Sequence, residues 1–157
     1  RSRASTSGTP SVSDINLDRL RELAGYLLGA VRELRELGRT PREAFLADSR
    51  TVNSAKYLLI VAAEAALDIC NHIAARRGGR SPRDYADCLT VLREIGAVGE
   101  GLAARLARMA RFRNLLVHLY WRVDDAEIYR VIQEDLSDLE EYLRSLGRFL
   151  KADLERP

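Results

Sequence analysis

The sequence of 157 residues has few of the residues that mark zinc-binding, redox-active or disulfide-stabilised proteins. Its two cysteines, Cys70 and Cys88, do not form a CxxC pair, so no zinc or redox motif is visible. Two isolated cysteines favour free thiols in a reducing, cytoplasmic compartment over a structural disulfide. No apolar run approaches the length that spans a bilayer, so we expect no transmembrane helix and no association with a membrane.

The sequence also lacks a strong excess of either charge, because 25 Lys and Arg residues nearly balance 23 Asp and Glu residues. A net charge of +2 gives no overall basic field of the kind that indicates nucleic-acid binding. Lysine itself is scarce and occurs only at Lys56 and Lys151. The excess of arginine fits the codon usage of a GC-rich genome, but arginine also makes planar, bidentate contacts with phosphate.

Strand-like alternation and internal repeats are absent, whereas apolar residues recur three and four positions apart along most of the chain. We therefore expect an all-α fold, an antiparallel bundle of four to five helices, in a single domain over residues 13–157. Residues 1–12 are rich in Ser, Thr, Gly and Arg. We expect them to be a disordered tail or a remnant of cloning.

Capping residues and breaks in the pattern give the expected helix boundaries. The first helix ends near Gly38, and the long second helix ends near Arg76. The last helix continues to the C-terminus, because leucine and isoleucine keep a near-heptad spacing there. The expected starts are Ser13 or Asp14, Thr40-Pro41 for a short helix, Asp48 or Ser49, Ser81-Pro82, Val98-Gly99, and Asp124 or Asp125.

One polar stripe interrupts the apolar helix over residues 49–76, where Glu64, Asp68 and His72 follow each other at intervals of four. Two carboxylates and an imidazole at this spacing are able to ligate a metal ion. A metal site in a helical bundle also needs ligands from other helices, and the sequence shows no matching second cluster. A buried polar network, or a stripe that faces a cleft, is the favoured interpretation.

The most informative stretch is residues 113–120, which holds Arg113, Asn114, His118 and Tyr120. On a helix that advances about 100° per residue, Arg113 and Tyr120 lie on nearly the same edge. Asn114 and His118 share another edge about 100–140° away, and Leu116 and Val117 would anchor the helix to the core. Either the long arginine folds across a turn to meet the histidine, or a second copy of the helix completes the site in a two-fold dimer.

These side chains suit the cleavage of RNA without a metal ion or cofactor. A neutral imidazole takes the proton of a ribose 2′-OH, or an imidazolium protonates the leaving 5′ oxygen. Arginine stabilises the charge that develops on the phosphorane, and Asn114 would orient the phosphate or ribose. Arginines along and after the same helix would hold the RNA backbone by charge. These are Arg105, Arg108, Arg111 and Arg122. Alternatively, the histidine is a structural residue and the arginines form a solvated face of ion pairs.

The pattern Arg113-Asn114-x3-His118-x-Tyr120 resembles the RX4HXY signature of HepT-like toxins of the HEPN superfamily. The continuation Trp121-Arg122-Val123-Asp124-Asp125, an aromatic residue followed by an acidic turn, is similar as well. Two segments at residues 45–51 and 64–73 also resemble the second-helix pattern of that family. The resemblance covers roughly residues 14–150, which is nearly the whole of the expected domain.

This resemblance implies an all-helical homodimer with metal-independent endoribonuclease activity, in which Arg113 and His118 are the catalytic pair and Asn114 assists. It also implies a partner, a small antitoxin with a minimal nucleotidyltransferase fold. That antitoxin would transfer AMP from ATP to Tyr120, placing bulk and negative charge beside Arg113. The alternative function is a non-catalytic helical dimer that binds a nucleotidyltransferase partner or a nucleotide.

Overall fold

The computed structural model describes residues 15–156 and contains no strand among them. Seven α-helices and one 3-10 turn make up this part of the chain. The expectation about residues 1–12 lies outside the described residues. In chain order the elements are α1 Leu17–Leu37, α2 Arg42–Ala47, α3 Ser49–Arg77, α4 Tyr85–Glu94, α5 Glu100–His118, the 3-10 turn η1 Tyr120–Arg122, α6 Asp125–Glu134 and α7 Leu136–Leu154.

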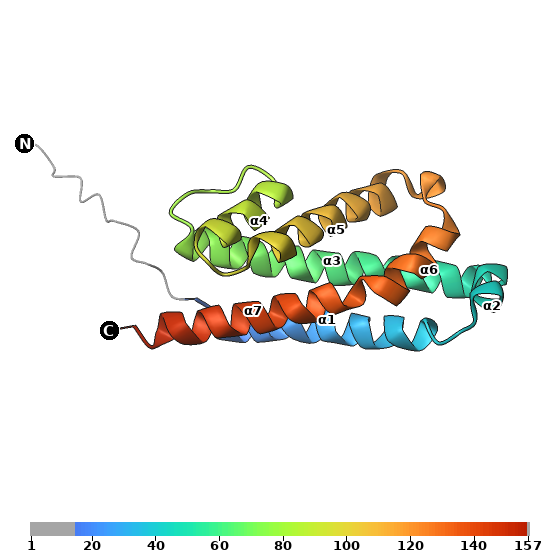
Figure 1. The fold of residues 1–157 in the computed structure, drawn as a ribbon, viewed down its shortest axis with the longest axis horizontal. Coiled ribbons are helices and arrows are strands. Elements are labelled where there is room, and N and C mark those ends of the chain that lie inside the picture. The colour runs from blue at the N-terminus through green and yellow to red at the C-terminus, as the bar shows by residue number, and fades with distance from the viewer. Residues whose placement is uncertain (1–14, 157) are drawn as a thin grey trace, which may run out of the picture.

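Four long helices, α1, α3, α5 and α7, run along the molecule with neighbours in opposite directions (Figure 1). Helix α3 lies against α1 on one side and against α4 and α5 on the other, while α7 packs on both α1 and α5. The expected all-α antiparallel bundle is therefore confirmed. It has more helices than expected because the predicted last helix is divided into α6 and α7. The short helices α2 and α6 complete the connections at one end (Figure 1).

Helix α3 is the exception to the expectation that no segment approaches a membrane-spanning length. By length and composition alone it is long and apolar enough to cross a membrane. In the bundle, 56% of its most apolar window is buried inside the protein. Its position between α1, α4 and α5 therefore accounts for its apolar character.

Several boundaries lie where the sequence places them. Gly38 ends α1, and its N–H donates to the carbonyl of Leu34. Asp48 caps α3 by accepting a hydrogen bond from the N–H of Arg50. Gly99 precedes the first residue of α5, and Asp124 caps α6 through the N–H of Ala126. A side-chain oxygen at a helix N-terminus satisfies an N–H group that has no partner within the helix.

Four boundaries differ from the expectation. Asn16 caps α1, whereas the expected caps Ser13 and Asp14 lie outside the described residues. Asp84 rather than Ser81 caps α4, since its carboxylate accepts a hydrogen bond from the N–H of Asp87. The other two corrections are Pro41, which replaces Thr40 as the residue before α2, and Asp135, which divides the predicted last helix into α6 and α7.

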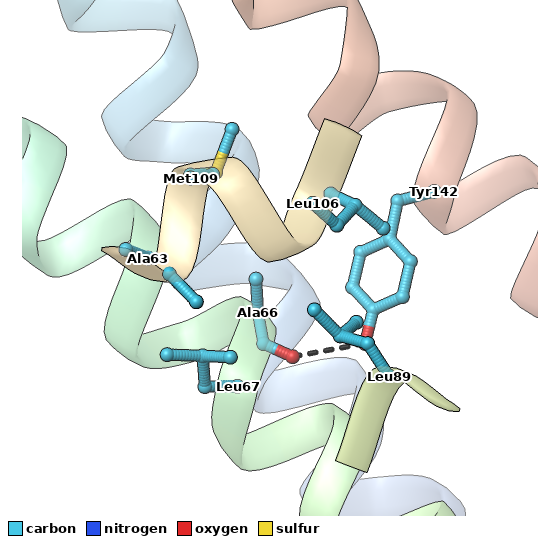
Figure 2. Close-up of a pocket in the computed structure, with 8 residues that line it drawn as sticks. Ala63, Ala66, Leu67, Leu89, Leu106, Met109 and Tyr142 are labelled. Carbon is cyan, nitrogen blue, oxygen red and sulfur yellow. Dashed lines mark hydrogen bonds between the residues drawn. The ribbon is translucent and has the colours of Figure 1, made fainter. Parts of the chain in front are cut away.

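The centre of the core is closed around Tyr142 of α7, which is buried between α3, α4 and α5. Its hydroxyl donates a hydrogen bond of 2.9 Å to the carbonyl of Ala66, as Figure 2 shows. The apolar cavity beside it measures only about 10 Å³, roughly the space of one water molecule. This cavity is too small for a ligand, so we place the functional site elsewhere. Cys70 and Cys88 are buried nearby as free thiols.

Candidate active site

Helix α5 carries Arg113 on the side that faces the rest of the bundle. Leu106, Ala110 and Leu116 are buried on this side, at helical spacings from Arg113. The side chain of Arg113 retains only 17% of its exposure. A guanidinium group in this position needs partners, because a partly buried charge without hydrogen bonds is costly.

Three groups hold the guanidinium of Arg113. Its Nε and Nη2 both pair with one carboxylate oxygen of Glu64 on α3. Its Nη1 donates a hydrogen bond of 2.8 Å to the side-chain oxygen of Asn114. The ring of Tyr85, the first residue of α4, lies 5.6 Å from the guanidinium carbon in a cation–π contact. Arg113 is therefore fixed by residues of three helices.

His118 is the last residue of α5 and is exposed. Asn114 lies one turn earlier and is also exposed, as the four-residue spacing predicts. Among the described residues the side chain of His118 has no hydrogen-bond partner, and nothing joins it to Arg113. This geometry agrees with the expectation that Arg113 and His118 lie on different edges of the same helix. Asn114 links the two residues, because it accepts a hydrogen bond from Arg113 and lies on the same edge of α5 as His118.

The expectation that Tyr120 shares an edge with Arg113 is wrong, because α5 ends at His118. Leu119 adopts φ −137° and ψ 43°, so the chain leaves the helical path there. Tyr120 then lies in the 3-10 turn η1 and is 60% exposed. Val117, an expected core anchor, is also 39% exposed, whereas Leu116 is buried as expected.

The polar stripe on α3 divides into separate roles. Glu64 belongs to the site through its pair with Arg113. Asp68 is exposed. The Nε2 of His72 accepts a hydrogen bond of 3.1 Å from the backbone N–H of Asn16, at the start of α1. The described residues contain no group of three or more His, Cys, Asp and Glu side chains able to hold a metal ion.

The arginines expected to bind RNA lie in different surroundings. Arg105 pairs with Asp138 at 3.0 Å and with Glu141 at 2.9 Å, both on α7, so acidic groups offset its charge. Arg108 and Arg111 are exposed and line a groove of about 340 Å³ between α5, α6 and α7. Neither has an ion-pair partner among the described residues. Arg122 is exposed in η1.

Tyr85 is the site residue that the sequence did not reveal. It is distant in sequence from Arg113, and no local pattern links a residue at the start of α4 to the middle of α5. Glu64 was visible only as part of the polar stripe. Its partner depends on how α3 and α5 pack, which helical periodicity alone does not specify.

The chain is similar to several known proteins. The family model described as ribonuclease HepT-like matches residues 27–146. A protein from Archaeoglobus fulgidus, provisionally named an RNase, is 32% identical over 117 residues, which are 74% of this chain and 82% of the relative. A protein from Shewanella oneidensis named mRNA nuclease HepT is 30% identical over 80 residues, 51% of this chain and 60% of the relative.

Two solved structures share the fold. The HEPN toxin of Shewanella oneidensis, tri-AMPylated and in complex with an MNT antitoxin, has a TM-score of 0.78 at 22% identity, covering 83% of this chain and 98% of that one. The cytosolic Bacillus subtilis protein YutE, of unknown function, has a TM-score of 0.76 at 18% identity, covering 91% and 96%. The family match and the Archaeoglobus relative each cover most of this chain. The protein therefore belongs to the HepT-like ribonuclease family.

Proposed function

We propose that the protein is the toxin of a HEPN/nucleotidyltransferase toxin–antitoxin system and acts as a metal-independent endoribonuclease. Membership of a ribonuclease family supports the reaction class. The observation that carries the assignment to residues is the fixed guanidinium of Arg113, held between Glu64, Asn114 and Tyr85. A cation held in one orientation is suited to a charge that develops only in the transition state.

The proposed reaction needs only the groups of the motif and the RNA. The 2′-oxygen of ribose attacks the adjacent phosphorus while the neutral imidazole of His118 accepts its proton. Arg113 stabilises the charge on the phosphorane oxygens. As the bond from phosphorus to the 5′ oxygen breaks, the imidazolium returns the proton to that oxygen. The products are a 2′,3′-cyclic phosphate and a 5′-hydroxyl, so no water or metal ion enters this step.

The separation of Arg113 and His118 on α5 supports a site that two copies of the chain build together. Leu115 and Val117 are 42% and 39% exposed on the same helix, beside Asn114 and His118. Exposed apolar side chains of this kind are stabilised when a second copy covers them. A two-fold axis near the end of α5 would bring Arg113 of one copy to the His118 of the other.

The RNA backbone would follow the free cations near this helix end. Arg108, Arg111 and Arg122 have no acidic partner among the described residues, so their charges are available to phosphate. Arg105 would contribute less to binding, because Asp138 and Glu141 already pair with it. Binding through such contacts weakens as the salt concentration rises.

We further propose that a small nucleotidyltransferase antitoxin neutralises the protein, by AMP transfer to Tyr120 or by covering the site. The HEPN toxin of similar fold is AMPylated and bound to an MNT antitoxin. The hydroxyl-bearing ring of Tyr120 is 60% exposed in η1, so it is accessible to a transferase. An attached AMP adds a negative phosphate and a nucleoside next to the motif.

The test is cleavage of RNA by the purified protein in the presence of EDTA. The wild-type chain should produce 2′,3′-cyclic phosphate ends, and His118→Ala should lose cleavage while retaining its helical circular dichroism. Cleavage that survives in a folded His118→Ala variant contradicts the mechanism. A protein that never cleaves RNA but binds a nucleotidyltransferase stably would instead be a non-catalytic binding module.

A further inference from the structure

An exposed aromatic pair begins two residues after the proposed catalytic histidine. Tyr120 and Trp121 are 60% and 66% exposed, and Trp121 is the only tryptophan in the sequence. Their ring centroids lie 5.3 Å apart at 81°, an edge-to-face arrangement. Tryptophan is highly buried on average in folded proteins, and tyrosine and tryptophan are enriched at binding interfaces.

The backbone around the pair is ordered by hydrogen bonds. The N–H of Leu119 donates to the carbonyl of Leu115 at 2.8 Å, which ties the turn to the last turn of α5. The N–H of Arg122 donates to the carbonyl of Leu119 at 2.8 Å, and Asp124 then begins α6 as its cap. The aromatic rings therefore project from a fixed turn, which lies at the end of the bundle opposite the end of α7 (Figure 1). A binding group on a fixed turn loses little conformational entropy when it binds.

The position and charge of the turn identify the chemistry of its ligand. Trp121 follows His118 by three residues, so their Cα atoms are at most about 11 Å apart. This corresponds to about three stacked nucleotides at roughly 3.4 Å each. Arg122 is exposed next to Trp121 and supplies a positive charge for the phosphate that accompanies a base. An aromatic face beside a cation is the combination that binds single-stranded nucleic acids.

We propose that Trp121 is a stacking platform for an unpaired nucleobase close to the scissile phosphate. Resting on the proposed ribonuclease function, this inference assigns the substrate class as single-stranded RNA. A base in a duplex is already stacked on its neighbours, and freeing it costs a few kcal/mol. An unpaired base reaches the indole without that cost. The platform accepts any base, because every base has a π-face.

The single tryptophan makes the contact directly measurable, since fluorescence excited selectively in tryptophan reports on Trp121 alone. The probes are two single-stranded oligonucleotides of equal length and charge in which deoxyribose removes the attacking 2′-OH. One carries bases throughout, and the other is abasic. Bound to the wild-type protein at low salt, the base-bearing oligonucleotide should quench the emission of Trp121, and the abasic one should leave it nearly unchanged.

Variants separate stacking from charge. Trp121→Ala should weaken binding of the base-bearing oligonucleotide by roughly 5- to 150-fold, the range for one base–aromatic stack. Binding of the abasic oligonucleotide should stay unchanged, and Trp121→Phe should retain most of the affinity. Tyr57→Ala is the matched control, because Tyr57 is 67% exposed but lies in another groove between α1 and α3. It should bind both probes like the wild type.

Three results would overturn the platform. The first is equal quenching by both probes, and the second is unchanged affinity in Trp121→Ala. The third is a blue shift of the emission with protein concentration alone, which would place a second copy of the chain over the indole. Cleavage assays on the same proteins keep the two proposals apart. Base-dependent quenching without any RNA cleavage refutes the ribonuclease proposal only, whereas normal cleavage with unchanged Trp121→Ala binding refutes the platform only.

Discussion

Replacing Glu64 by glutamine tests whether the pair on α3 positions Arg113 for chemistry. Glutamine keeps the length of the side chain and a hydrogen-bond acceptor but removes the charge that pairs with the guanidinium. Breaking a fully buried ion pair costs about 3–5 kcal/mol, whereas an exposed pair contributes less than about 1 kcal/mol. Glu64 is 35% exposed and Arg113 is 17% exposed. We therefore expect an intermediate loss of about 1–2 kcal/mol in the free energy of unfolding.

The two kinetic constants, KM and kcat, should respond differently to Glu64→Gln. Removing a negative charge beside the site strengthens the attraction of RNA, so KM should stay constant or fall. A guanidinium that is no longer fixed stabilises the phosphorane less well, so kcat should fall by about tenfold or more. The assay measures initial rates of cleavage against RNA concentration in EDTA, together with unfolding in urea.

Asp153→Asn provides the matched control for this experiment. Asp153 of α7 pairs with Arg77 of α3 at 2.9 Å, and both side chains are 16% exposed. Its loss should lower the free energy of unfolding by an amount similar to that of Glu64→Gln or larger, and should leave kcat unchanged at a temperature where the protein is folded. If Glu64→Gln behaves like this control, with reduced stability and an unchanged kcat, then Glu64 has only a structural role and the reasoning is refuted.

Three further predictions follow from other contacts. Mixing inactive Arg113→Ala and His118→Ala chains should restore about one quarter of the wild-type cleavage rate, because half of the dimers would be mixed and each mixed dimer would have one of its two shared sites complete. No recovery after subunit exchange would argue for sites within one chain. Burial and, as a smaller effect, the charges of two nearby arginines lower the pKa of His72 in the folded chain. Its stabilising effect is therefore full above about pH 6.5 and declines as the pH falls below this value, so urea unfolding from pH 7.5 to 5.5 should show a slope that His72→Gln reduces. Tyr142→Phe should cost about 1 kcal/mol in thermal unfolding through its lost bond to Ala66, and an unchanged melting temperature would contradict this.

The fold was predictable because its information is local. Apolar spacing of three and four gives each long helix, and short connections require neighbours to be antiparallel. Capping residues such as Asp48 and Asp124 were identifiable because a cap acts within its own turn. The break at Asp135 was not, since the apolar spacing continues across it. The division accompanies a change in packing, because α6 packs mainly on α2 and α3 whereas α7 packs mainly on α1 and α5.

The candidate site was predictable only along one helix. Arg113, Asn114 and His118 were identified because they lie within two turns of α5. The groups that hold Arg113, Glu64 and Tyr85, come from two other helices, and their contacts depend on packing between elements. Arg105, Arg108 and Arg111 of α5 were expected to act alike, either in binding RNA or in ion pairs. Arg105 differs from the other two because α7 supplies carboxylates there.

The end of α5 at His118 changes how modification of Tyr120 would inhibit the protein. On a continuous helix, an AMP group on Tyr120 would lie beside Arg113 and compete for its charge. In the structure Tyr120 lies in η1, in contact with Trp121 and next to Arg122. The attached adenine would then reach the indole and occupy the position proposed for a base of the substrate. Intact mass and Trp121 emission, followed together during incubation with antitoxin and ATP, should show quenching that rises with AMP addition and is absent in Tyr120→Phe. AMP addition at Tyr120 without quenching would indicate that the AMP group inhibits by competing for the charge of Arg113 and not by covering Trp121.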